Sequence, residues 1–123
     1  MTDIELTRAL ERGELPNDGF HHGHHLRVGL VYLDESASVA DAIARMAATL
    51  RAFAASVGKA EKYSQPLTEF WMYQLAAARA LAPHVAADAL FAACPRLLDK
   101  NLYLAYYSGD GAAARSADSS GNS

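Results

Sequence analysis

One segment, residues 38–58, places the strongest constraint on the fold of this chain. Apolar residues recur in it at a spacing of three to four and stop at a glycine: Val39, Ala42, Ile43, Met46, Ala47, Leu50, Phe53, Ala54, Val57 and Gly58. This spacing places the apolar side chains on one face of a helix. Ser38 followed by Asp41 resembles a capping box at the helix start. Because such a helix must bury its apolar face against other elements, the segment predicts a fold of packed helices.

Two helices are expected before this segment. Asp3 is a suitable cap for a first helix, which Gly13 ends. Residues 26–33 then form a run apolar enough to be buried almost all round. We interpret this run as a helix, because no alternation and no second strand accompany it.

Prolines divide the second half of the chain into further helices. Pro66 suits the first turn of a helix that Pro83 ends. Another helix is expected from near His84 to Pro95, after which one turn and a final aromatic-rich helix complete the domain. Alanine is abundant and β-branched residues are sparse, which also favours helix. The sequence thus predicts an all-α fold, a compact single-domain bundle of five or six helices.

The domain is expected to cover residues 1–108. Residues 109–123 are small and polar, with nothing to bury against a core, and predict a flexible C-terminal tail. The formal net charge of −3 and the lack of any basic run argue against a nucleic-acid partner. No apolar stretch approaches the roughly 18 residues that a membrane span needs. The N-terminus is acidic where a secretory signal is basic, so a cytoplasmic location is expected.

The densest group of reactive side chains is a histidine cluster, His21, His22, His24 and His25. His22 and His25 are three residues apart, as are His21 and His24, so each pair shares a face if the segment is helical. Two imidazoles one turn apart can bind one Zn, Cu or Fe ion. The alternative is a solvated histidine patch without a ligand.

Two histidines make only half of a metal site, so at least one more ligand is required. The chain offers several candidates, none of them marked by spacing: His84, Glu69, Asp99, Glu61 and Cys94. Because Cys94 is the only cysteine, a cysteine-only zinc site and an internal disulfide are excluded. Aromatic residues are candidates for the walls of an apolar pocket, or else for the core: Trp71, Tyr73, Tyr103, Tyr106 and Tyr107.

Three motifs occur in a characteristic order. They are FHHGHH running into an apolar helix, YSQPLTEFW, and CPRLLDKNLYLAYY, and together with the helix between them they span roughly residues 19–108. In this order they resemble a poorly characterised family of small bacterial helical proteins. Members of that family carry F-x-H-x-x-H, then Y-H-x-T-x-T ahead of a tryptophan, and N-P-x-L-L-D ahead of a tyrosine pair.

The resemblance implies roles for individual residues. It places the two N-terminal histidines of the family at His22 and His25, and its aromatic and polar pocket residues at Phe20, Tyr63, Thr68 and Trp71. In the family a third histidine and usually a glutamate follow the tyrosine. Here those positions hold Ser64 and Gln65, so a strong metal ligand and a carboxylate base are both replaced.

Three outcomes follow from this replacement. In the first, His22, His25 and a substitute ligand hold an ion, the substitute being His21, His24 or His84. In the second, the ion is bound weakly and substrate atoms complete its ligand shell. In the third, the ion has been lost. Ser64 and Gln65 are then candidates for binding a polar group of the substrate.

The first hypothesis from the sequence is a small metal-dependent enzyme that acts on a small organic molecule. An oxidoreductase is favoured over a hydrolase or a lyase. The ion would be a divalent Fe, Cu or Zn. The second hypothesis is a metal-free descendant that binds an apolar small molecule or steers a cyclisation or proton transfer. The third is a helical interaction subunit without chemistry, for which dimerisation would be evidence.

Overall fold

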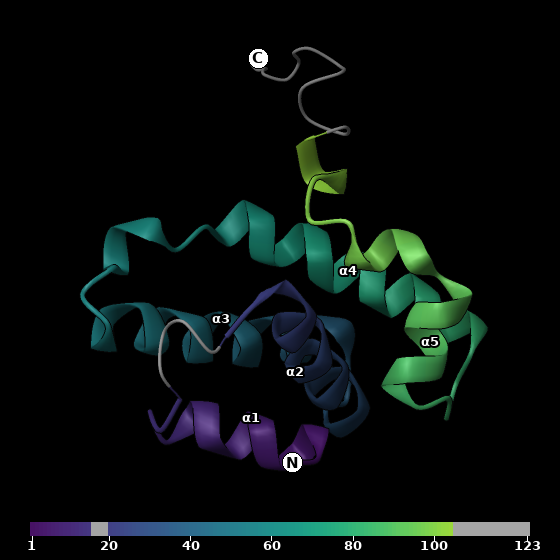
Figure 1. The fold of residues 1–123 in the computed structure, drawn as a ribbon, viewed down its shortest axis with the longest axis horizontal. Helices are drawn as coiled ribbons and strands as arrows, with labels where there is room; N and C mark the ends of the chain where they lie inside the picture. Colours follow the sequence, from purple (N-terminus) through teal and green to yellow (C-terminus); the bar gives the residue numbers. More distant parts are fainter. Residues whose placement is uncertain (16–19, 105–123) are drawn as a thin grey trace.

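The computed structural model describes residues 1–15 and 20–104, and over these ranges the chain folds into helices without any strand. In chain order they are α1 (Asp3–Glu11), α2 (His22–Glu35), α3 (Val39–Ser56), η2 (Ala60–Lys62), α4 (Gln65–Leu81), α5 (Ala87–Ala93) and η3 (Pro95–Leu98). The all-α prediction is confirmed (Figure 1). No helix in the described ranges is long and apolar enough to cross a membrane. The expected tail, residues 109–123, lies outside the described residues.

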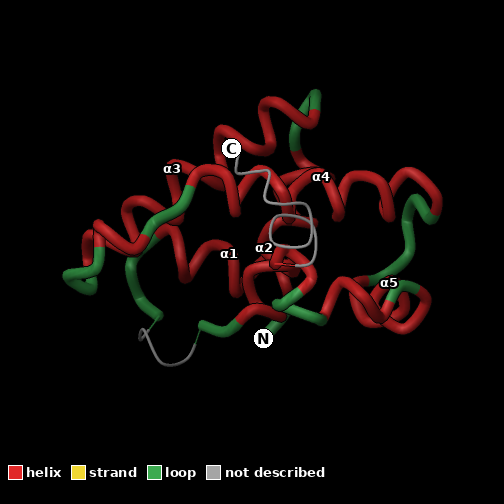
Figure 2. Tube along the Cα trace, turned by 90° about the horizontal axis from the view of Figure 1, so that it is seen from above, coloured by secondary structure: helices red, strands yellow, loops and turns green. Residues whose placement is uncertain are grey.

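Helix α2 is the centre of the bundle. It packs against α1, α3, α4 and η3, and Figure 1 shows it between α1 and α4. Its apolar run is buried almost all round, as the sequence predicts, with Arg27 and Leu33 half-buried. The buried residues are Leu26, Val28, Gly29, Leu30, Val31 and Tyr32. Seen along the perpendicular direction in Figure 2, the other helices surround α2. Each neighbouring helix buries its own apolar stripe against it, which explains why one helix of the bundle lacks a polar face.

The helix starts follow from local capping. Ser38 accepts a hydrogen bond from the backbone N–H of Asp41 and begins α3, as the sequence predicts. At α1 the cap is Thr2, and our assignment of Asp3 was wrong by one residue. Thr2 and Glu5 complete a reciprocal capping box, in which Glu5 Oε1 accepts from the Thr2 N–H at 2.7 Å. This pair satisfies two free donors of the first turn, whereas an Asp3 cap would satisfy fewer.

Helix α5 begins later than the sequence indicates, at Ala87 and not near His84. His84 has a positive φ of 71°, a left-handed conformation that cannot continue a helix. After Pro95 the chain forms the single 3-10 turn η3 and then enters a helix at residues 102–104, as the sequence predicts. The residues after 104 lie outside the described part of the chain.

A polar cluster joins α1, α2 and α3 beside the core. The fully buried Tyr32 donates from its hydroxyl to Glu11 Oε2 at 2.6 Å and lies 2.7 Å from Thr49 Oγ1. Because the phenol proton is used on the carboxylate, Thr49 is the donor in the second bond. Burial and the Glu11 hydrogen bond raise the pKa of Tyr32 to about 12. Arg8 binds Glu11 and also Glu35 of α2, which extends the cluster to the surface.

Helices α2 and α4 approach closely at Gly29. A Cβ at this position would lie 2.7 Å from Leu75 Cδ1 and 3.0 Å from Met72 Sδ. Both side chains are 1% exposed. A residue with a Cβ at this position would therefore require the ends of the Leu75 and Met72 side chains to move, so glycine permits the closest packing of this helix pair.

We expect opposite effects from alanine at the two glycines of α2. Gly23→Ala meets nothing within 4 Å, so it should raise the free energy of unfolding by about 0.5–1 kcal/mol through helix propensity. Gly29→Ala should be less stable than Gly23→Ala by about 1–3 kcal/mol, because Leu75 and Met72 must move. Urea denaturation of the two variants measures the difference. Equal stabilities would contradict the close α2–α4 contact.

Candidate functional site

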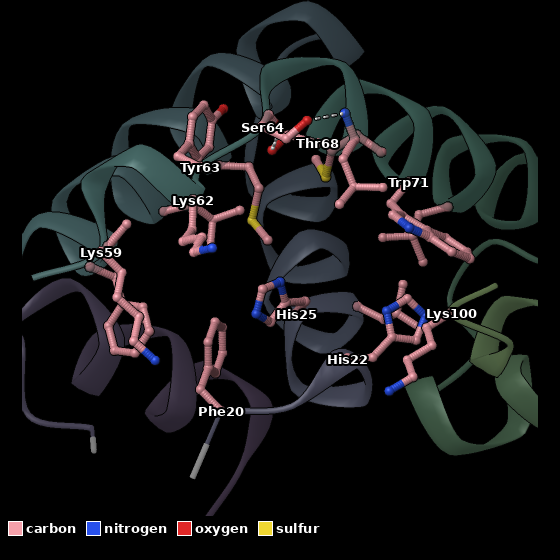
Figure 3. A pocket seen from close by; sticks show the side chains of 18 of the residues that line it. Phe20, His22, His25, Lys59, Lys62, Tyr63, Ser64, Thr68, Trp71 and Lys100 are labelled. Carbon is pink, nitrogen blue, oxygen red and sulfur yellow. Dashed lines mark hydrogen bonds between the residues drawn. The ribbon is translucent and has the colours of Figure 1, made fainter. Parts of the chain in front are cut away.

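A cavity of about 500 Å³ opens between α2, α3 and the first turns of α4. Figure 3 shows that α2 supplies two histidines to its interior, while the η2–α4 turn supplies polar groups at its edge. Most of its wall is apolar: Leu26, Met46, Leu50, Phe53, Ala54, Val57, Leu67, Met72 and Leu75. A concave, mainly apolar space of this size with a few polar groups is typical of a small-molecule site.

Residues from two separate segments of the sequence prediction meet in this cavity. They are Phe20, His22, His25, Tyr63, Ser64, Thr68 and Trp71. Phe20 and the histidines come from the start of α2, and the others come from the turn into α4 and its first two turns. The tertiary structure thus brings together most of the residues that the motifs single out.

The histidine cluster divides into two pairs with different surroundings. His21 is exposed and precedes the first residue of α2. Its backbone N–H donates to Nδ1 of His24 at 3.1 Å. The first turn of a helix has N–H groups without partners, and this bond satisfies a donor next to that turn. His21 and His24 do not line the cavity, whereas His22 and His25 do.

His22 is oriented by a backbone carbonyl. Its Nε2 lies 2.9 Å from the carbonyl oxygen of Leu97 in η3, and its ring meets Trp71 edge-on at 4.5 Å. A carbonyl oxygen only accepts, so Nε2 carries the proton. In the neutral ring Nδ1 then has a free lone pair. The contact also ties η3 to the start of α2.

His25 is held by packing and not by hydrogen bonds. Its ring stacks on Phe20 with 4.2 Å between centroids. Burial, followed by the neighbouring His22 and His24, lowers the pKa of His25 to about 4, so the imidazole is neutral at pH 7. No described residue forms a hydrogen bond with either ring nitrogen, and neither nitrogen is sealed from the cavity. The ring therefore offers one donor and one acceptor to a bound molecule.

Ser64 and Thr68 owe their positions to the start of α4. Ser64 Oγ accepts from the backbone N–H of Leu67 at 3.2 Å, which caps the helix. Thr68 Oγ1 donates to the Ser64 carbonyl at 2.9 Å. Ser64 is thus a helix cap as well as a residue of the cavity wall.

Tyr63 and Gln65 form a polar chain beside the cavity. The Tyr63 hydroxyl donates to Gln65 Oε1 at 2.7 Å, and Gln65 Nε2 donates to Glu69 Oε2 at 2.8 Å. The guanidinium of Arg51 lies over the Tyr63 ring at 5.1 Å. Gln65 is therefore occupied by protein groups and does not itself line the cavity.

Some of the predicted site residues lie elsewhere. Tyr73, a predicted pocket residue, is 58% exposed, because it points away from the face of α4 that carries Trp71 and Met72. His84 is exposed in the turn before α5. Tyr106 lies outside the described residues.

Over residues 1–15 and 20–104, no group of three His, Cys, Asp or Glu side chains is placed to hold a metal ion. The described residues thus leave the half-site of His22 and His25 without a third protein ligand.

The sequence prediction missed the basic residues at the mouth of the cavity. Lys59 and Lys62 come from the α3–α4 connection, and Lys100 with Asn101 follows η3. Exposed lysines do not form a sequence pattern that indicates a binding site. The only available signal was that the chain contains just three lysines, two of them beside the Tyr63 motif.

Comparisons with models of known protein families, with curated proteins and with solved structures found no match. The chemistry of the cavity itself therefore supplies the argument for function.

The buried His25 predicts a specific loss of stability in acid. Its pKa is about 4 in the folded protein and about 6.5 when unfolded, so the unfolded chain takes up the proton first as pH falls. The contribution is complete above pH 6.5 and is lost as pH falls towards 4. Between pH 7 and 4.5, the free energy of unfolding of the wild type should decrease by about 2–3 kcal/mol more than that of His25→Gln. Urea denaturation at both pH values tests this, and parallel decreases would contradict it.

Proposed function

We propose that the protein binds a small, largely apolar organic molecule in the cavity, without a metal ion, and that His25 hydrogen-bonds to a polar group of that molecule. The observation that carries this proposal is the neutral His25 imidazole, which faces a 500 Å³ apolar cavity without a hydrogen-bond partner among the described residues. Its ring nitrogens are open to the cavity and are not used by the described protein groups, so they can hydrogen-bond to a polar atom of a bound molecule.

The surroundings of His25 favour recognition over strong base catalysis. With a pKa of about 4, the ring is a weak base at neutral pH, yet it still accepts and donates hydrogen bonds without carrying a charge. Phe20 keeps the ring in place from one side. Trp71, oriented by His22, adds a flat apolar surface for stacking. These features suit a ligand with an apolar body and one or two polar atoms.

A variant that fills the cavity tests this proposal. Ala54 lines the cavity from α3, whereas Ala52 on the same helix is exposed. Ala54→Trp should weaken binding of the neutral fluorescent probe N-phenyl-1-naphthylamine by at least about tenfold, because the indole occupies the space. Ala52→Trp adds the same ring outside the cavity and should bind within about twofold of the wild type.

Fluorescence titration of the full chain measures both affinities, and thermal unfolding checks that both variants fold. If the wild type does not bind the probe, or if Ala54→Trp binds it as tightly as Ala52→Trp, the proposed binding function is wrong. His25→Phe keeps the ring and its packing while removing the nitrogens, so it isolates the hydrogen bond. For a ligand with a polar group in reach of His25, this variant should bind about 5- to 10-fold more weakly.

Metal-dependent catalysis is the second candidate function. The observation in its favour is His22, whose Nε2–H is held by the Leu97 carbonyl while Nδ1 is left unprotonated. Histidines that bind metals commonly donate their other N–H in this way. His22 and His25 also line the same cavity as Ser64. The described residues do not complete a ligand set, so we derive no catalytic step.

Restoring the family histidine tests this second candidate. If the positional match is correct, Ser64→His should bind Zn²⁺ at least about tenfold more tightly than the wild type, because a third imidazole joins His22 and His25. Ser64→Ala is the control, since both variants lose the helix cap at a cost of about 1 kcal/mol. Calorimetric titration of tag-free protein gives the affinities. Equal affinity of all three proteins would remove the support for a metal site here.

A further inference from the structure

All three lysines of the chain lie around one opening. Lys59, Lys62 and Lys100 line the cavity, although they belong to two segments some forty residues apart in the sequence. Figure 3 shows Lys59 and Lys62 on one side of the cavity and Lys100 on the other. The described residues that line the cavity include no aspartate or glutamate. The described lining residues therefore carry three positive side chains and no negative one, in a chain whose formal net charge is −3.

The lysines differ from the arginines in their pairing. Over the two described ranges, five arginines each form an ion pair with a carboxylate: Arg8, Arg12, Arg27, Arg45 and Arg79. In the same part of the chain no lysine forms one. Within the described ranges the fold thus neutralises most of its guanidinium groups, whereas the three ammonium groups around the cavity form no ion pair there.

We propose that the ligand of this cavity is an amphiphilic organic anion, with a carboxylate or phosphate bound at the lysine-lined mouth and an apolar body inside. This inference rests on the proposed binding function and names its substrate class. Three like charges near one opening repel one another, and an anion between them removes that repulsion. Because the walls are apolar, they focus the field of the lysines at the mouth.

The distribution of charge inside the cavity sets the orientation of the ligand. Among the described residues, the interior offers the His25 imidazole, other polar groups such as His22 and Thr68, and apolar side chains, with no aspartate, glutamate, lysine or arginine inside. Burying an unpaired carboxylate there would cost several kcal/mol. At the mouth the exposed lysines can reach the anion while water still solvates it. The anionic end therefore lies outward and the apolar end inward.

Two matched probes separate the anionic requirement from binding itself. 1-Anilinonaphthalene-8-sulfonate has the same aromatic body as N-phenyl-1-naphthylamine plus one sulfonate. We expect the triple variant Lys59→Gln, Lys62→Gln, Lys100→Gln to bind the sulfonate probe at least about tenfold more weakly and the neutral probe within about twofold of the wild type. The triple Lys→Arg variant keeps the charges and should bind both probes like the wild type. Arg12→Gln removes one positive charge away from the cavity and should leave the affinity for the sulfonate probe nearly unchanged, whereas each single Lys→Gln variant should lower it.

Displacement of the sulfonate probe distinguishes the chemical classes of ligand. Decanoate and decyl phosphate should compete better than 1-decanol by at least about tenfold, and this advantage should shrink as salt is raised from 0.02 to about 0.5 M. The better of the two anions identifies the head group. If both naphthalene probes bind equally to the wild type and to the Lys→Gln variant, the anion inference fails while the binding function stands. If neither probe binds the wild type, the proposed function itself fails.

Discussion

The structure depends on the close contact of α2 with α4 at Gly29. With no side chain at this position, Leu75 and Met72 pack directly against the α2 backbone, and the apolar run of α2 is buried almost all round. The remaining helices then have one common surface against which to bury their apolar faces. The same contact aligns the first turn of α2 with the first turns of α4, and the cavity lies between these turns.

The polar and charged groups around the cavity are paired less completely than those in the rest of the described structure. Elsewhere capping side chains satisfy helix ends, and carboxylates pair with most arginines. Around the cavity, by contrast, His25 has no hydrogen-bond partner among the described residues, and three neighbouring lysines have no counter-charge there. The polar groups around the cavity are thus left available to a bound molecule. The proposed organic anion would use both His25 and the lysines, which unites the two proposals in one ligand.

Part of the site was predictable from local patterns and part was not. Phe20, His22 and His25 share one side of a helix start, so their spacing alone indicates a common site. The same spacing also pairs His21 with His24, yet these two lie outside the cavity and form a hydrogen bond with each other at the start of α2. The difference depends on which side of α2 faces the core, and that is a property of the neighbouring helices. Lys100 joins the site only because η3 returns to the start of α2 through the Leu97–His22 hydrogen bond.

The sequence by itself determined the all-α class, the long helix that Ser38 begins and the buried character of residues 26–33, because period, capping and breaking residues act within a few positions along the chain. Only the tertiary structure decided which side chains meet. The meeting of Ser64 with His22 and His25 around one cavity, the exposure of Tyr73 and the position of the three lysines along that cavity all depend on how helices cross. Those crossings are set by side-chain volumes in contact across the core, which no local pattern records.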